Sequence, residues 1–259
     1  MSNHFHLVLH IDTDRALQWS PEEVINCWLA LYTGPVVAQR YKAGATLTTV
    51  EEEALAGYIE TWRARLSDLS WYMRALNETI ARMANREDNC TGRFWEGRFR
   101  SQALLDEAAL ISCMAYVDLN PIRAEMCTTL EQSEFTSIHE RLRAFSAKKK
   151  KVSSSWLAPM GSNEMKSGGI LPIAQIDYFA LVDWTGRVIR DDKRGAIPST
   201  IKPILQRLGI EEGNWVKNTQ FFGRRFRRVL GRIDRVRTFA DRINQKWLTG
   251  LEEARAFYR

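Results

Sequence analysis

The chain has few of the residues that build disulfide-rich, metal-cluster or membrane proteins. Only four cysteines occur among its 259 residues, and no two of them stand in C-x-x-C spacing, which argues against a disulfide framework and a zinc ribbon. Its apolar runs fall well short of the roughly 18 residues of a membrane span. The apolar stretch after Met1 lacks a basic lead-in and a small-residue cleavage site. These absences predict a reduced, cytoplasmic protein with no membrane partner.

The chain also lacks a surplus of acidic charge, and its basic charge is unevenly placed. The net charge is +6. Residues 141–151 alone carry a net +6, and residues 221–242 carry eight arginines against two aspartates, again +6, so the rest of the chain is net acidic. Two concentrated basic patches predict an anionic partner.

Histidine is scarce as well, since the chain has four, and three of them stand near its start as His4, His6 and His10. On a strand, alternate side chains share a face. Alternation over residues 4–11 therefore predicts a strand with the histidines and Val8 on one face and an apolar core face opposite. Two imidazoles on one side are half of a metal site, with His10 a bystander.

Helix signatures follow. Ser20-Pro21-Glu22-Glu23 combines an N-cap, a proline at the first helical position and a capping-box glutamate, which predicts a helix over 21–32. Apolar residues at helical spacing predict one long helix, or two in series, over 51–85. Asp106 is a good N-cap for a helix that extends to Leu119 and is stopped by Pro121.

Other segments favour strands and a linker. Residues 93–100 alternate arginine with aromatic residues and predict a second strand, and residues 178–189 predict a short hairpin turning at Thr185-Gly186. Residues 146–169 resemble a flexible basic linker. We therefore expect a domain over 1–145, the linker over 146–169, and a mainly α-helical basic domain over 170–259.

The last basic stretch predicts one amphipathic helix whose apolar positions recur at alternating intervals of four and three. Its arginines form a solvated face or bind a DNA backbone, and the sequence leaves both readings open. The apolar positions are Phe222, Phe226, Val229, Ile233, Val236, Ala240 and Ile243.

Tyr116 stands four residues before Asn120, which precedes a proline. This spacing places a hydroxyl and an amide oxygen on one face of a helix's last turn. Asp118 is close in sequence but points elsewhere on that helix, so the group that takes the proton from Tyr116 stays unassigned.

Three motifs together carry a family resemblance: Asn-His-Phe-His-Leu-Val-Leu from residue 3, Gly-Arg-Phe-Trp-Glu-Gly-Arg-Phe from residue 92, and Tyr-Val-Asp-Leu-Asn-Pro-Ile-Arg-Ala from residue 116. In this order they resemble the single-tyrosine HUH transposases of insertion sequences, most closely the REP-associated tyrosine transposases. The resemblance covers about residues 1–145. It implies an α+β fold with a ferredoxin-like HUH domain, which here lacks its N-terminal strand-helix-strand. We expect that Met1 is an internal methionine chosen as the start of a longer gene. The alternative is that the chain is a decayed copy of such a transposase.

The resemblance also implies roles. His4 and His6 would bind Mg²⁺ or Mn²⁺, with Asn120 as third ligand where relatives often have glutamine. Tyr116 would attack a phosphate of single-stranded or hairpin DNA, leaving a 5′-phosphotyrosine link and a free 3′-hydroxyl for strand transfer. The residues expected to contact DNA are Arg93, Trp95, Arg98, Arg100, Arg123, Arg224, Arg225, Arg227 and Arg228.

The sequence allows alternatives both for the arginines of residues 93–100 and for the function of the chain. The arginines of residues 93–100 suit stacking and phosphate contact, or they merely guard an edge strand. The whole chain is a DNA transposase, an inactive DNA-binding remnant of one, or a replication-initiator or relaxase-type HUH nuclease.

Overall fold

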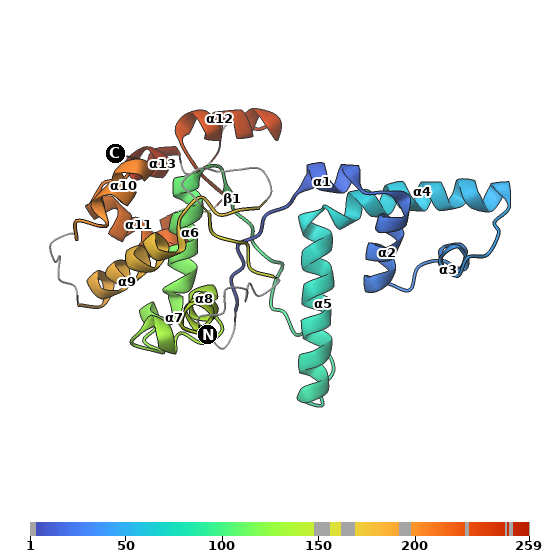
Figure 1. Ribbon diagram of the computed structural model, residues 1–259, viewed down its shortest axis with the longest axis horizontal. Coiled ribbons are helices and arrows are strands. Elements are labelled where there is room, and N and C mark those ends of the chain that lie inside the picture. The colour runs from blue at the N-terminus through green and yellow to red at the C-terminus, as the bar shows by residue number, and fades with distance from the viewer. Residues whose placement is uncertain are drawn as a thin grey trace. The chain divides into compact units, whose positions relative to one another are not determined.

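The computed structural model describes residues 4–147, 156–161, 169–191, 198–225, 228–246, 248 and 251–258. Helices dominate these residues, and the one sheet among them has two short parallel strands. The chain divides into two compact units, labelled element by element in Figure 1. We call residues 9–100 the helical unit, and residues 4–8 with 101–258 the tyrosine unit, because the latter contains Tyr116.

The helical unit begins each of its main helices with a side-chain cap. Ser20 and Glu23 form a reciprocal capping box at α2, with Pro21 in the first turn, as the sequence predicted. The expected long helical stretch is two helices in series, α4 and α5, divided at Ser67 and Asp68. The bounds are α1 Thr13–Gln18, α2 Pro21–Leu31, α3 Val36–Lys42, α4 Thr49–Leu66 and α5 Leu69–Glu87.

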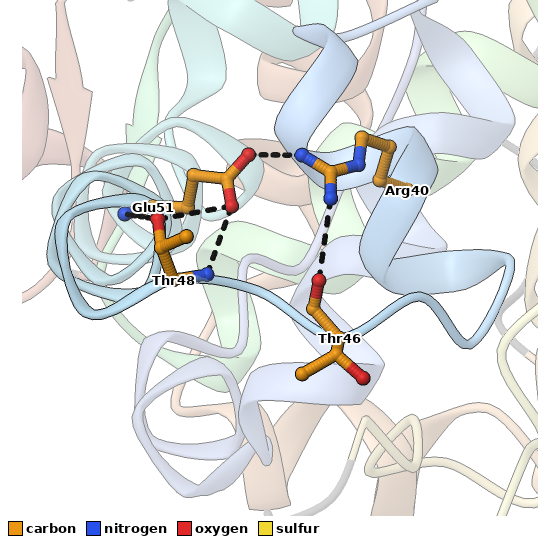
Figure 2. Close-up of polar contacts among 4 residues, drawn as sticks. All are labelled: Arg40, Thr46, Thr48 and Glu51. Atoms are coloured by element: carbon orange, nitrogen blue, oxygen red, sulfur yellow. Dashed lines mark hydrogen bonds and ion pairs between the residues drawn. The ribbon is translucent and has the colours of Figure 1, made fainter.

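A second capping box links α3 to α4. Figure 2 shows the Glu51 carboxylate accepting hydrogen bonds from the backbone N–H and the hydroxyl of Thr48, at 2.9 and 3.1 Å. Arg40 of α3 makes an ion pair with the same carboxylate and donates to the Thr46 carbonyl at 3.2 Å. One glutamate therefore both caps α4 and fixes the loop between the two helices.

Tryptophans form the centre of the helical unit. Trp28 of α2 and Trp62 of α4 stack with ring centroids 5.3 Å apart and planes 6° apart, and the Arg65 guanidinium lies 4.3 Å from the centroid of Trp71 on α5. Such aromatic packing adds to the burial of apolar area. The buried core is Val24, Ile25, Trp28, Ala38, Leu55, Ile59 and Trp62.

In the tyrosine unit, α6 is the central element (Figure 1). It is buried over nearly its whole length, from Ala108 to Asp118, and α9, α10 and α11 contribute to the same core. The elements are β1 Ala103–Leu104, α6 Glu107–Asp118, α7 Asn120–Arg123, a 3₁₀ helix Leu130–Gln132, α8 Ser137–Ser146, α9 Gln175–Asp191, α10 Lys202–Leu208, α11 Glu212–Arg225, β2 Val229–Leu230, α12 Ile233–Arg242 and α13 Leu251–Phe257.

Asp106 anchors the first end of α6. Its side chain caps the helix at the Ala109 N–H, at 3.0 Å, as predicted. It also accepts hydrogen bonds from the Arg232 N–H at 2.7 Å and the Tyr258 hydroxyl at 2.5 Å. Just before it, β1 pairs with β2, Ala103 opposite Val229 and Leu104 opposite Leu230. One carboxylate thus joins α6 to the start of α12 and the end of α13.

Asp118 anchors the other end of α6. Its carboxylate is fully buried and accepts hydrogen bonds from the Ser137 hydroxyl at 2.7 Å, the Ile138 N–H at 3.1 Å and the Tyr178 hydroxyl at 2.5 Å. Burial raises the pKa of Asp118 and raises the pKa of Tyr178 well above its ordinary value. The end of α6 is therefore fixed to the first turn of α8 and to α9.

Both predicted strands are wrong. Residues 4–12 belong to no helix or strand, and neither do residues 93–100. A strand needs a partner for its backbone groups, and local alternation supplies none. In the second segment the Arg93 guanidinium folds back onto the carbonyls of Trp95 and Glu96, at 2.8 and 2.5 Å. The expected ferredoxin-like sheet is not seen in the described residues.

The hairpin predicted over 178–189 is also wrong, because this segment is the middle of α9. Tyr178, Leu181, Val182 and Thr185 are all buried, which is a helical period rather than alternation. The Thr185 hydroxyl donates to the Leu181 carbonyl one turn earlier, at 2.6 Å.

The C-terminal stretch is not one continuous helix. Among the described residues, α11 ends at Arg225, β2 follows at Val229–Leu230, and α12 begins at Ile233. Helices otherwise dominate after Ile201, as predicted. Phe226 lies outside the described residues.

The boundary expected at 146–169 does not separate two units. Much of that segment lies outside the described residues, but Ile138 before it and Leu181 after it belong to one hydrophobic core. The division falls instead on either side of residues 9–100.

Within the described parts, no helix combines the length and apolarity required to cross a bilayer.

We predict that Asp118→Ala lowers the free energy of unfolding by about 3 kcal/mol, because it leaves three buried donors without an acceptor. Asp118→Asn should lose less than about half of that, since the amide oxygen can replace one carboxylate oxygen and the amide can donate to Tyr178. Urea unfolding of both variants measures this. Equal losses in the two variants would contradict the role assigned to the hydrogen bonds.

Candidate functional site

Tyr116 is the meeting point of four segments of the tyrosine unit. The half-buried ring on α6 lies 5.4 Å from the ring of Phe222 on α11 and 5.7 Å from the imidazole of His6, measured between centroids. The guanidinium carbon of Arg123, at the end of α7, lies 4.0 Å from the same centroid. The structure therefore brings His6, Arg123 and Phe222, from three other segments of the chain, into contact with the Tyr116 ring.

The two histidines of the N-terminal segment are neighbours. Their ring centroids lie 5.2 Å apart at an interplanar angle of 86°, and both side chains are exposed. Val8 packs partly against the core of the unit, whereas Phe5 and Leu7 are 38% and 46% exposed. The predicted division into a core face and a histidine face is therefore wrong, because the histidines and the apolar residues Phe5 and Leu7 are all exposed and only Val8 packs partly against the core.

Asn120 is buried at the first position of α7. Its side-chain oxygen accepts a hydrogen bond from Arg123 Nη2 at 2.9 Å. As predicted, α6 ends just before Pro121, with Leu119 as its C-cap, and Pro121 stands in the first turn of the next helix, α7. Because Arg123 contacts both the Tyr116 ring and the Asn120 oxygen, these two predicted site residues lie around one guanidinium.

The electrostatics favour a neutral His6. Partial burial lowers the pKa of His6, and the charges of His4 and Arg123 lower it further. A neutral imidazole keeps a lone pair available for a metal ion. Burial and both neighbouring charges thus favour the neutral form of His6, which is the form that coordination requires.

The two histidines fit a divalent cation. With a metal–nitrogen bond of roughly 2.1 Å, two imidazoles bound at 90–109° would have centroids roughly 4.5–5.3 Å apart, and the observed separation is 5.2 Å. The third candidate ligand is the Asn120 oxygen, which accepts a hydrogen bond from Arg123 Nη2. Two nitrogens and an amide oxygen accept Mn²⁺ readily and Mg²⁺ less so. No group of three or more His, Cys, Asp or Glu that suits a metal occurs in the described residues.

Asp118 does not belong to this site. As predicted, it points away from Tyr116, and all three of its described hydrogen bonds go to Ser137, Ile138 and Tyr178. A buried carboxylate engaged in this way is a structural anchor rather than a proton acceptor for Tyr116.

Sequence reasoning missed the contribution of α11. A Cβ placed on Gly223 would lie 2.7 Å from the Tyr116 hydroxyl oxygen and 3.3 Å from its ring carbon Cζ. The preceding residue, Phe222, is buried against the ring. Nothing in the local sequence links Gly223 to Tyr116, because the contact depends on how α11 packs against α6.

The remaining predicted DNA contacts lie elsewhere. Arg93, Trp95, Arg98 and Arg100 belong to the helical unit, where the Trp95 indole donates to the Asn77 carbonyl at 2.9 Å and both Arg98 and Arg100 are exposed. Arg228 is exposed just before β2. Arg224 and Arg225 end α11, with side chains outside the described part of the structure, and Arg227 lies outside it entirely.

Comparisons with known proteins leave the site to be judged on its own geometry. No protein-family model, no curated protein and no solved structure matches this chain.

We predict that Gly223→Ala lowers the free energy of unfolding by about 1–3 kcal/mol, because the new methyl group overlaps the Tyr116 hydroxyl. Gly213→Ala, on the same helix, is the matched control: no atom lies within 4 Å of its Cβ position, so it should be neutral or stabilise by up to about 1 kcal/mol. Thermal and urea unfolding compare the two. Unchanged stability of Gly223→Ala would show that α11 is not held against Tyr116.

Proposed function

We propose that this chain is a single-tyrosine, metal-dependent DNA strand transferase of the HUH transposase kind, acting on single-stranded or hairpin DNA. The observation that carries the proposal is the cluster of His4, His6, Tyr116 and Asn120. Arg123 contacts Tyr116 and Asn120, His6 lies beside the Tyr116 ring, and His4 lies beside His6. They are the same residues for which the family resemblance implies chemistry.

In the proposed reaction the Tyr116 oxygen attacks the phosphorus of a DNA phosphodiester. The bond from phosphorus to the 3′ oxygen breaks, and the proton that the Tyr116 hydroxyl gives up to solvent is balanced by the proton that the departing 3′ oxygen takes from it, which leaves a 5′-phosphotyrosine and a free 3′-hydroxyl. A second strand's 3′-hydroxyl then attacks the phosphotyrosine, restores a phosphodiester and releases Tyr116. The bond energy is kept in the covalent intermediate, so strand transfer needs no external energy source.

The residues of the site have distinct tasks in this scheme. His6, Phe222 and Arg123 surround the Tyr116 ring and limit its orientations, which favours a productive line of attack. His4, His6 and Asn120 would hold Mn²⁺ or Mg²⁺. When bound, the ion polarises the phosphate and neutralises developing negative charge. Arg123 Nη1 is buried and has no hydrogen-bond partner among the described residues, so a phosphate oxygen that reached it would satisfy this donor.

The finer fold and the location belong to the same proposal. The support for a ferredoxin-like HUH fold is the sequence resemblance of residues 1–145, because no sheet of that kind occurs in the described residues. A cytoplasmic location is supported by Cys27, Cys90, Cys113 and Cys127, all of which are free thiols.

We predict that the chain, incubated with labelled single-stranded hairpin DNA and Mn²⁺, forms a covalent adduct visible on a denaturing gel. Tyr116→Phe removes the attacking oxygen, and chelation by EDTA removes the ion, so each should lower adduct formation by at least about a thousandfold. Tyr72→Phe is the control, because Tyr72 is 47% exposed in the helical unit and should leave the yield unchanged.

Three outcomes of that experiment discriminate between functions. An adduct that survives Tyr116→Phe excludes the proposed nucleophile. Folded chain that binds the hairpin but forms no adduct indicates an inactive DNA-binding remnant. Cleavage that follows an origin sequence rather than a palindromic repeat indicates a replication initiator or relaxase.

We predict that the exposed arginines of the helical unit contact phosphates. The double variant Arg98→Ala, Arg100→Ala should weaken DNA binding and reduce the slope of log K against log salt by about two, because two counterion-releasing contacts are lost. Fluorescence anisotropy over a salt series measures the slope. The matched control is Arg82→Ala with Arg86→Ala on α5. An equal reduction in the control would indicate diffuse attraction rather than contact by residues 98 and 100.

A further inference from the structure

Arg123 links the proposed nucleophile to the proposed third metal ligand. Its guanidinium carbon lies 4.0 Å from the Tyr116 ring centroid, and its Nη2 donates to the Asn120 oxygen at 2.9 Å. The two contacts come from one side chain at the end of α7, a helix of four residues. The guanidinium therefore engages an oxygen that a cation at the site would need.

The charge of Arg123 has no carboxylate to balance it in the described residues. Its one described hydrogen-bond acceptor is a neutral amide, and the buried Nη1 has no partner there. The His6 imidazole and the Arg123 guanidinium both contact the Tyr116 ring, so the positive charge lies close to the imidazole. A guanidinium that repels positive charge at an imidazole repels a divalent cation there more strongly, since the interaction scales with the charge.

A phosphate is a ligand that would balance the charge of Arg123 and accept a hydrogen bond from its buried Nη1. The guanidinium fork matches phosphate oxygens and forms two parallel, charge-assisted hydrogen bonds with them. Binding of a phosphodiester to Arg123 would neutralise its charge and draw its donors away from Asn120. Both effects favour a cation held by His4, His6 and the Asn120 oxygen.

Resting on the proposed function, we propose that Arg123 is a positioning residue that couples the two ligands. Without DNA it holds the Asn120 oxygen and keeps the affinity of the site for a divalent cation low. When a phosphate of single-stranded DNA pairs with Arg123, the site gains its third oxygen and loses a repelling charge. Metal and DNA then strengthen each other's binding by equal factors, as thermodynamic linkage requires. If the charge of Arg123 served only to hold α7 against α6, metal binding and DNA binding would not affect each other.

The test measures Mn²⁺ affinity of the full chain, from the electron paramagnetic resonance signal of free Mn²⁺, with and without single-stranded oligothymidylate. Arg123→Met keeps an unbranched stem over Tyr116 but removes the charge and the donors. Arg123→Lys keeps the charge. Arg187→Met is the matched control, because Arg187 is exposed on α9 and pairs with Asp183, so the net charge changes equally. Protein-free DNA corrects for Mn²⁺ bound by the oligonucleotide.

We expect Arg123→Met to bind Mn²⁺ about tenfold more tightly than the unaltered chain without DNA, whereas Arg123→Lys and Arg187→Met stay within about twofold. Oligothymidylate should raise Mn²⁺ affinity in the unaltered chain and do so several-fold less in Arg123→Met. Mn²⁺ binding that depends on the histidines but is unchanged or weakened by Arg123→Met overturns the coupling and leaves the proposed function standing. Mn²⁺ binding that survives His4→Ala with His6→Ala, or no binding at all, overturns both.

Discussion

The carboxylate of Asp118 is the constraint on which the tyrosine unit depends. It accepts from the first turn of α8 and from Tyr178 of α9 at full burial. A buried carboxylate is tolerated only when its oxygens are satisfied, so the end of α6 has little freedom to rotate or slide. Tyr116 stands two residues before this anchor, and Asn120 stands two residues after it. The rigidity that the proposed nucleophile, Tyr116, would need is therefore supplied by a residue that has no part in the proposed chemistry.

The candidate site is built on that fixed helix end from parts with no local relation to one another. The N-terminal segment contributes the imidazoles, α7 contributes the amide and the guanidinium, and α11 contributes Phe222 and the close approach of Gly223. The site contains positive charge and neutral donors, but the described carboxylates nearest in sequence are engaged elsewhere. Such a site is complementary to an anion, and a phosphodiester has the charge and the oxygens to complete it.

Sequence rules that depend on contacts within one helical turn gave correct predictions. The capping residues Ser20 and Asp106 begin helices as expected, because a cap satisfies backbone groups within one turn. The prediction of strands was wrong because pairing is not a local property, and alternation over residues 4–11 says nothing about a partner. Of the residues in the candidate site, the histidines, Tyr116 and Asn120 could be named from sequence motifs, whereas Gly223 and the double contact of Arg123 depend on packing between α6, α7 and α11.

The packing of α11 against α6 also changes the role that we assign to the C-terminal half of the chain. A separate basic domain after residue 170 would influence the reaction only by bringing DNA closer. Instead, Ile138 and Leu181 share one core, and α11 covers the Tyr116 ring through Phe222. Residues after 170 are therefore part of the structure that orients the tyrosine, and a substitution in α11 acts on the geometry of the hydroxyl as directly as one in α6. For this reason Gly223, rather than any arginine of the basic stretch, is the C-terminal residue whose replacement bears most directly on Tyr116.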